Sequence, residues 1–170
     1  FHSLVGMAAV LVAAGAFYAP SAFDIGTVGN IHTQSLIEMA IGVAIGAITF
    51  TGSVLAFCKL QGSIGSRPLI LPGRHLLNLA AVLICAWLGV IVFRADGHAA
   101  IGALLLITLI AFLIGAHIVW AIGGADMPVV VSLLNSYSGI AGAAAGFAIG
   151  NTVLVVAGSL VGASGLILTQ

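Results

Sequence analysis

A few polar side chains interrupt the long apolar runs of this sequence, and three of them carry groups suited to moving protons. His2 opens the first run, Ser53 lies in the second, and Asn135 begins an Asn-Ser-Tyr-Ser cluster in a later one. Imidazole has the unperturbed pKa nearest to physiological pH. Because a polar group in hydrocarbon normally faces a partner or a water path, we predict that His2, Ser53 and Asn135 line one inward polar path. A structural histidine bonded to a neighbouring serine or carbonyl remains the other interpretation of His2.

Two carboxylates at the ends of apolar runs are also candidates. Glu38 lies a turn or two into the second run, where it is either an interfacial carboxylate in contact with water or a point of proton access. Asp126 comes directly before Met127-Pro128, a pattern typical of a helix N-cap followed by a first-turn proline. We therefore expect Asp126 to cap a helix, whatever else it does.

Several kinds of chemistry have no motif in the sequence. No glycine-rich phosphate loop follows a strand pattern, so no cofactor site is predicted within these residues. There is no HExxH and no pair of carboxylates suited to hydrolysis, and no cluster of metal ligands. A net charge of zero argues against nucleic acid as a partner. Cys58 and Cys85 belong to no C-x-x-C pair and should be free thiols.

Composition indicates which elements position these residues. Hydrophobic residues make up 62% of the 170 residues and charged residues 5%, with a mean hydropathy of +1.32. About 20 apolar residues of helix cross a hydrocarbon core, and the runs lack the alternation of a barrel strand. We therefore predict one all-α domain, a polytopic transmembrane bundle in a lipid bilayer. Breaks at Gly, Pro, Asp and Arg divide it into about six helices, approximately 1–19, 32–58, 75–93, 99–122, 127–149 and 152–170.

Basic residues and glycines add orientation and packing. Lys59, Arg67 and Arg74, three of the four basic residues, fall in the connection after the second helix, which predicts that this connection and the C-terminus are cytoplasmic. Small-xxx-small ridges mark close helix contacts. They occur in the second, fifth and sixth helices, at Gly42-xxx-Gly46, Gly142-xxx-Gly146-xxx-Gly150 and Gly158-xxx-Gly162.

A short internal repeat is also visible. His2-Ser3-x-x-Gly6-x-Ala8 parallels Asn135-Ser136-x-x-Gly139-x-Ala141, and each copy is followed by a Gly/Ser/Thr-rich helix. Duplicated helix pairs are common in secondary transporters. In a chain so rich in Gly and Ala, chance similarity is the alternative explanation.

Longer stretches resemble one known family. They are HSLVGMAAVLV from His2, GAITFTGSVLAF from Gly46, RPLILPGRHLLNLAA from Arg67, IGGADMPVVVSLLNSYSGIAGAAAGF from Ile122 and GSLVGASG from Gly158. Together they resemble the membrane domain of the proton-translocating NAD(P) transhydrogenase beta subunit, over nearly the whole chain. The resemblance implies a proton-conducting domain that couples proton translocation to hydride transfer between NAD(H) and NADP(H). Separate soluble domains carry out that transfer, so the fragment alone is not expected to be catalytic.

The resemblance also assigns residues and partners. It implies that His2, Ser53 and Asn135 belong to the proton path, that Glu38 gives proton access, and that Asp126 faces the nucleotide domains. The implied partners are an alpha subunit, which carries the NAD(H)-binding domain and its own membrane helices, and a C-terminal NADP(H)-binding domain of the same chain. A dimer of the complete enzyme is expected. The implied location is the bacterial inner membrane, or the mitochondrial inner membrane in a eukaryote.

The chain departs from the family in places. Family members have further helices before this point and a nucleotide-binding domain after it, so we expect the sequence to be a piece of a longer protein. A small polar position of the sixth helix is Ala163 here, which leaves the role of that helix's hydroxyls open. Two other functions remain open, a secondary transporter with duplicated helix pairs and a non-catalytic membrane anchor. A nucleotide-binding fold after Gln170 would separate them from the transhydrogenase.

Overall fold

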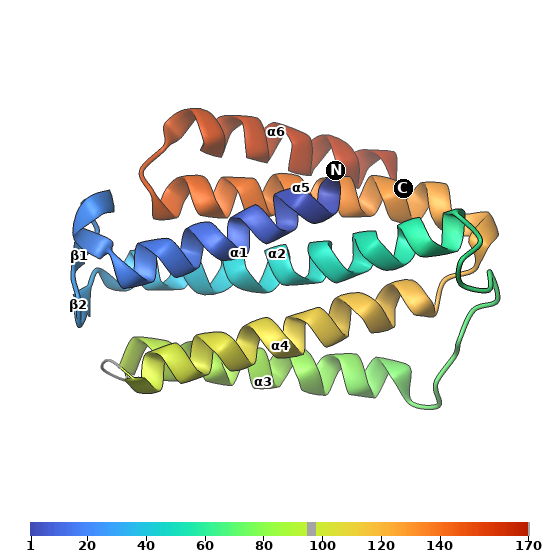
Figure 1. Cartoon of the computed structure of the whole chain (residues 1–170), viewed down its shortest axis with the longest axis horizontal. Helices are drawn as coiled ribbons and strands as arrows, with labels where there is room; N and C mark the ends of the chain where they lie inside the picture. Colours follow the sequence, from blue (N-terminus) through green and yellow to red (C-terminus); the bar gives the residue numbers. More distant parts are fainter. Residues whose placement is uncertain (95–97, 170) are drawn as a thin grey trace.

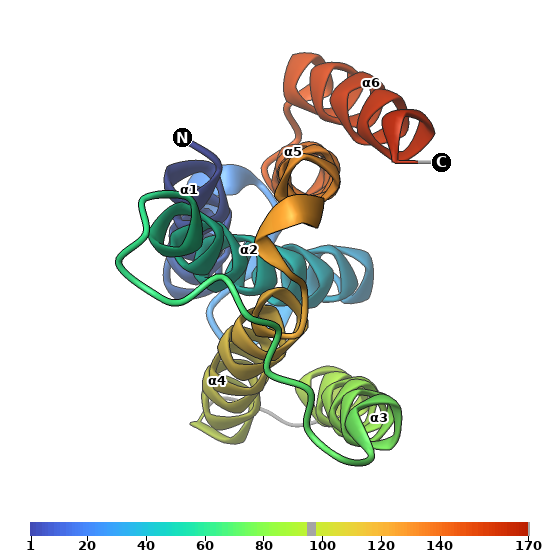
Figure 2. The same cartoon turned by 90° about the vertical axis from the view of Figure 1, so that its right-hand side faces the viewer.

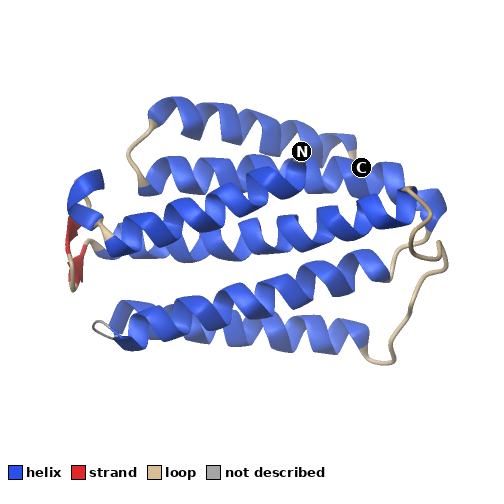
Figure 3. Ribbon diagram, in the orientation of Figure 1, coloured by secondary structure: helices blue, strands red, loops and turns tan. Residues whose placement is uncertain are grey.

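The computed structural model describes residues 1–94 and 98–169, which form a bundle of six α-helices (Figures 1 and 3). The predicted all-α fold class is therefore confirmed. The helices are α1 (His2–Tyr18), α2 (Thr33–Leu60), α3 (Arg74–Arg94), α4 (His98–Trp120), α5 (Met127–Ala148) and α6 (Thr152–Leu168).

The helix boundaries lie within two residues of those that the Gly, Pro, Asp and Arg breaks predict. Pro20 follows α1, and Gly150, with a φ of +68° that glycine adopts readily, separates α5 from α6. The connection after α1 is more ordered than the predicted loop. It holds a 3₁₀ turn (Pro20–Phe23) and two paired strands, β1 (Gly26–Thr27) and β2 (Asn30–Ile31). The connection between α3 and α4 includes residues 95–97, which lie outside the described part of the chain.

The second helix is the centre of the bundle. In the end-on view, α2 is surrounded by α1, α4 and α5, while α3 packs beside α4 and α6 beside α5 (Figure 2). Among the described residues, α6 makes its main contacts with α5 alone, and large apolar side chains of α3 and α6 point away from the bundle. An aqueous surface of this kind would be unfavourable, whereas lipid accepts it.

Glycines let the central helices approach closely. A Cβ at Gly6 of α1 would lie 2.5 Å from the carbonyl oxygen of Gly46, and a Cβ at Gly46 would lie 2.7 Å from that of Gly6. On the other side of the bundle, Gly139 of α5 meets the backbone of Gly158 and Gly162. The predicted glycine ridges of α2, α5 and α6 are thus helix contact faces, except at Gly150, which lies after the end of α5 and where a Cβ would meet nothing within 4 Å.

In the described part of the chain, four helices are long and apolar enough to cross a membrane, namely α2, α3, α4 and α5. The described α1 and α6 are 17 residues each, at the lower limit of about 17 residues for a spanning helix. The bundle therefore has the dimensions and the surface of a membrane domain, as its composition predicts.

Candidate functional site

Ser53 differs from the two threonines that closely precede it on α2, Thr49 and Thr51. Thr49 donates to the carbonyl oxygen of Ile45 at 2.7 Å, and Thr51 donates to that of Phe112 on α4 at 2.8 Å. The Oγ of Ser53 is buried, yet it has no hydrogen-bond partner among the described residues. A buried polar group without a partner costs about 1–3 kcal/mol, so such a group requires an explanation. A hydroxyl that is not committed to the backbone can exchange hydrogen bonds with a passing water.

His2 lies at the depth of Ser53 on the neighbouring helix. Helices α1 and α2 are antiparallel, and a Cβ at Gly6 would lie 2.8 Å from the amide nitrogen of Phe50. One turn of about 3.6 residues back from Gly6 reaches His2, and one turn on from Phe50 reaches Ser53. His2 is half-buried, and the N-terminus lies part-way along the bundle instead of at its end (Figure 1).

Asn135 shares this depth on α5. A Cβ at Gly52 of α2 would lie 2.9 Å from Cδ2 of Leu134, and Ser53 and Asn135 each follow one of these two residues. The side chain of Asn135 is half-buried. Helices α1 and α5 also touch one another, because Ala9 packs in one cluster with Ala141 and Ala145. The fold therefore brings α1, α2 and α5 together at the level of the three predicted residues.

The structure does not join the three side chains directly. Among the described residues, no hydrogen bond links His2, Ser53 or Asn135 to one another. A single residue step turns a helix by about 100°, so a shared depth does not fix a shared direction. Their role as one polar path stays a prediction. The structure shows a buried Ser53 hydroxyl without a partner among the described residues, with the His2 imidazole and the Asn135 carboxamide at the same depth.

Glu38 lies beside a polar cavity near the opposite end of α2 from Lys59. The cavity has a volume of about 480 Å³. Its lining comes from the α1–α2 connection, the start of α2 and the end of α5, and includes Asp24, His32, Gln34, Ser35 and Glu38. Gln34 donates a hydrogen bond of 2.9 Å to Glu38 Oε1, and the carboxylate is half-buried. This position suits contact with water at the mouth of the bundle, and a role of Glu38 in proton access stays a prediction.

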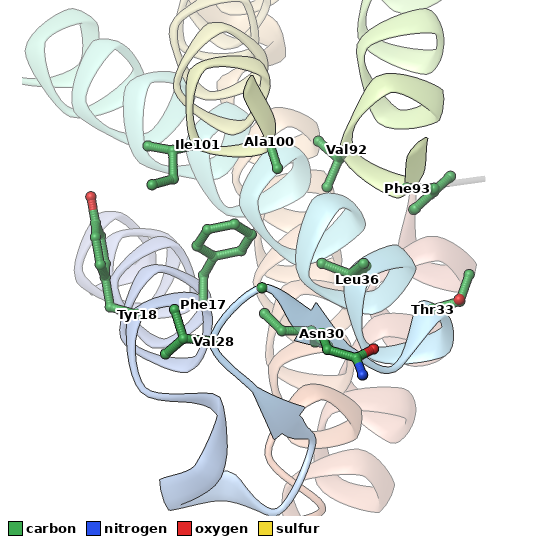
Figure 4. A pocket seen from close by; sticks show the side chains of 12 residues that line it. Phe17, Tyr18, Val28, Asn30, Thr33, Leu36, Val92, Phe93, Ala100 and Ile101 are labelled. Atoms are coloured by element: carbon green, nitrogen blue, oxygen red, sulfur yellow. The ribbon is translucent and has the colours of Figure 1, made fainter. Parts of the chain in front are cut away.

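A second cavity, of about 260 Å³, lies at the same end of the bundle between α1, α2, α3 and α4 (Figure 4). Its side chains are mostly apolar, with Phe17, Leu36 and Val92 from three different helices around it (Figure 4). It includes none of the predicted site residues. No group of three or more potential metal ligands occurs among the residues that the structure describes.

Asp126 occupies the predicted position but does not cap the helix. It stands at the N-cap of α5, with Pro128 in the first turn, and it ends a 3₁₀ turn that begins at Gly124. Its side chain makes no capping hydrogen bond. The expected cap is therefore wrong, because Asp126 has φ −93° and ψ 6° instead of the extended geometry that usually turns a capping oxygen toward the helix amides. The carboxylate is exposed at the surface of the α4–α5 connection.

Lys59 is the polar residue that the sequence pattern placed in the wrong environment. The charge pattern treats Lys59 as the stop of a helix and the start of a loop. In the structure it is in the last turn of α2 and is only 3% exposed. Its Nζ donates to three carbonyl oxygens at the end of α4, those of Val119, Trp120 and Ile122. Nothing in the local sequence indicates this, because the acceptors lie about sixty positions away.

Other polar contacts between helices also depend on the fold. Ser136 of α5 donates to the carbonyl oxygen of Gly162 on α6 at 2.6 Å. His117 of α4 lies 2.8 Å, Nδ1 to Oδ1, from Asn78 of α3. Cys58 and Cys85 are free thiols, as predicted. Among the described residues, the Ser53 hydroxyl and the Nε2 atom of His117 are the fully buried side-chain polar atoms without a hydrogen-bond partner.

Comparison with known proteins covers the full length of the chain. A family described as NAD(P) transhydrogenase beta subunit matches residues 1–170. The chain is 53% identical over 169 residues to NAD(P) transhydrogenase subunit beta of Rhodospirillum rubrum, and the sequence from a named strain of that species gives the same figures. This chain belongs to the NAD(P) transhydrogenase beta subunit family.

The aligned region covers 99% of this transhydrogenase beta-family chain but 36% of the Rhodospirillum relative. The match therefore concerns one part of a longer protein, and in this chain that part is the helix bundle. The family predicted from the Gly46, Arg67 and Ile122 stretches is confirmed.

Proposed function

We propose that this bundle is the proton-conducting membrane part of a transhydrogenase, with His2, Ser53 and Asn135 along the path. The uncommitted Ser53 hydroxyl carries the proposal, because it is buried at the depth of His2 and Asn135 while the neighbouring threonines are bonded to carbonyl oxygens. A proton path needs polar groups that are free to exchange partners. Membership of the transhydrogenase beta family supplies the reaction to which such a path belongs.

In this proposal the chain performs no hydride transfer itself. Soluble domains bind NAD(H) and NADP(H), the NADP(H) domain follows residue 170, and an alpha subunit contributes the NAD(H) domain and further membrane helices. Glu38, beside the polar cavity, gives protons access from outside. Asp126, exposed in the α4–α5 connection, faces the nucleotide domains. The complete enzyme is a dimer in the bacterial inner membrane or, in a eukaryote, the mitochondrial inner membrane.

The imidazole of His2 has the central role because a proton carrier must gain and lose a proton near neutral pH. We expect His2→Ala in the complete enzyme to lower proton-coupled hydride transfer by about a hundredfold, the lower end of what a positioned proton-transfer group contributes. Hydride exchange between the soluble domains that needs no proton passage should fall far less. Sealed vesicles with a pH-sensitive dye, assayed beside nucleotide turnover, measure both quantities.

His75→Ala is the matched control, since His75 is an exposed imidazole at the start of α3. Full pumping by His2→Ala at the normal rate would reduce His2 to a packing residue. The search for the titrating group would then move to Glu38. Equal losses in both histidine variants would indicate a general effect on the membrane domain.

The secondary transporter remains the alternative function. The likeness of the α1–α2 and α5–α6 pairs favours it, because transporters are often built from repeated helix pairs. Against it stands the family match over all 170 residues. A complete protein that continues into another helix after residue 170, and that moves a solute other than protons, would support the transporter.

A further inference from the structure

The end of α2 that the basic residues predict to be cytoplasmic carries a buried cation that the proposed proton path does not use. Lys59 donates hydrogen bonds of 2.8 Å to the carbonyl oxygens of Trp120 and Ile122 and one of 3.3 Å to that of Val119. No carboxylate forms an ion pair with it among the described residues. An ammonium group has three donors, and here all three are used on backbone carbonyls of the last turn of α4 and the connection that follows it.

The end of α4 explains why a cation is stable in this place. The last carbonyls of a helix lack partners within that helix and carry the negative end of its dipole. A positively charged side chain is therefore favoured at this end, and it usually comes from the last turn of the same helix. In this chain α2 supplies it, so the C-terminus of α4 is closed by a residue that is distant in sequence.

Further contacts join α2 to α4 before Lys59 in the sequence, and the loop after α2 to the connection after α4. Thr51 of α2 donates to the carbonyl oxygen of Phe112, and Gly115 of α4 packs directly on the backbone of Ile48. The amide of Gly124 donates to the carbonyl oxygen of Ser66 at 3.1 Å. The α4–α5 connection is therefore held to α2 and to the loop that follows α2.

The hydrogen bonds of Lys59 lie between the two parts of the proposed site, Ser53 and the loop of Asp126. Ser53 precedes Lys59 by six residues, about 9 Å along the helix at 1.5 Å per residue. Ile122, the last carbonyl that Lys59 binds, precedes Asp126 by four residues. A displacement of α2 at the level of Ser53 therefore has a short, hydrogen-bonded route to the loop that bears Asp126.

We propose that Lys59 is a positioning residue that holds the Asp126 loop in register with α2 and so couples the membrane path to the nucleotide domains. The coupling half of this statement rests on the proposed function. The anchoring half rests on the three hydrogen bonds alone. Among the described residues, Lys59 has no hydrogen bond to a residue of the path, and it acts through the backbone at the end of α4.

The first experiment measures the anchoring without any assay of activity. Ala125 is exposed beside Asp126, so Ala125→Cys in the complete protein reports on the loop. A membrane-impermeant maleimide is applied from the cytoplasmic side of membranes, and background labelling of the parent is subtracted. With Lys59→Met added, we expect the introduced thiol to label about tenfold faster, within the usual range of coupling between sites. Lys59→Arg keeps donors at this position and should restore most of the slow labelling.

Arg67→Met is the matched control, because Arg67 is an exposed base in the loop after α2 with no hydrogen bond to α4. It removes the same charge from the same side of the membrane and should leave labelling unchanged. Unchanged labelling in Lys59→Met would overturn the proposal. An equal increase in Arg67→Met would overturn it as well, since charge and not anchoring would then control the loop. If Lys59→Met does not reach the membrane, Lys59→Gln takes its place in each comparison.

The second experiment measures coupling in sealed vesicles. Lys59→Met should lower proton-coupled hydride transfer about tenfold. Hydride exchange that needs no proton passage should stay near that of the parent, and Arg67→Met should behave as the parent in both assays. Faster labelling with normal coupled turnover would overturn the coupling role. Failure of the proposed function has a different signature, because the parent enzyme itself would then move no protons while the labelling result remained unaffected.

Discussion

The α1–α2 and α5–α6 helix pairs are built alike but differ in where their polar groups are bonded. In each pair a glycine of the first helix packs on backbone of the second, Gly6 on Gly46 and Gly139 on Gly162. The two glycines stand at the same place in the short repeat, in His2-Ser3-x-x-Gly6 and Asn135-Ser136-x-x-Gly139. Helices α1 and α5 also run in the same direction, side by side (Figures 1 and 2).

The difference lies in the hydroxyls. In the α5–α6 pair, Ser132 and Ser136 donate to carbonyl oxygens of α6, at 3.3 Å and 2.6 Å. In the α1–α2 pair, Ser53 is buried with no partner among the described residues. Close glycine packing is thus common to both pairs and serves association. A buried hydroxyl without a partner among the described residues is found in the α1–α2 pair, and the proposed path joins this pair to Asn135 of α5.

The largest expected effect comes from filling the shared glycine contacts. A Cβ at Gly139 would overlap the backbone of Gly158 and Gly162, and one at Gly6 would lie 2.5 Å from the carbonyl oxygen of Gly46. Because backbone cannot move aside as a side chain can, Gly139→Ala and Gly6→Ala should each lower the free energy of unfolding by about 1–3 kcal/mol. Thermal unfolding of the complete protein in detergent measures this.

Gly102→Ala is the control for both, since a Cβ on this α4 residue would meet nothing within 4 Å. It should be neutral or slightly stabilising, because alanine favours helix over glycine. A large loss of unfolding free energy in Gly6→Ala with none in Gly139→Ala would contradict the conclusion that the two pairs pack in the same way.

A smaller effect should separate the two pairs by function. Ser136→Ala removes the hydrogen bond to Gly162 and should destabilise the fold by about 0.6 kcal/mol, the average for such bonds in membrane proteins. Proton-coupled turnover should stay near normal. Ser53→Ala breaks no hydrogen bond to the protein, so stability should not fall, yet coupled turnover should. Unfolding and vesicle assays on the same preparations test this crossed pattern, and parallel behaviour of the two variants would contradict it.

The smallest effect is expected on the outer face of α6. Ser159 and Ser164 are exposed and donate to carbonyl oxygens of their own helix, those of Val155 and Val161. Ser159→Ala should therefore change the free energy of unfolding by less than about 0.5 kcal/mol and leave coupled turnover unchanged. A substantial loss of turnover, measured in the vesicle assay, would bring the α6 hydroxyls into the path and remove the contrast between the pairs.

Local sequence was enough for the helices because their ends depend on local chemistry. Pro20 cannot continue a helix, Gly150 adopts a positive φ easily, and long apolar runs in lipid satisfy their backbone groups only as helices. The residues of the candidate site could be named because polar groups are few in so apolar a chain. Their depth on neighbouring helices could not be known, since it depends on the glycine contacts that set the register of α1, α2 and α5.

By itself the sequence determined that this protein is an all-α membrane bundle of the transhydrogenase beta family, and where its polar residues stand along each helix. Only the tertiary structure decided which of those polar residues form hydrogen bonds, and with which partners. Lys59 donates to the carbonyls at the end of α4, Ser136 donates to α6, and Asp126 does not cap α5. The Ser53 hydroxyl is buried without a partner among the described residues. The physical reason is that hydrogen bonds between helices join residues far apart in the chain, and their geometry exists only after the helices have packed.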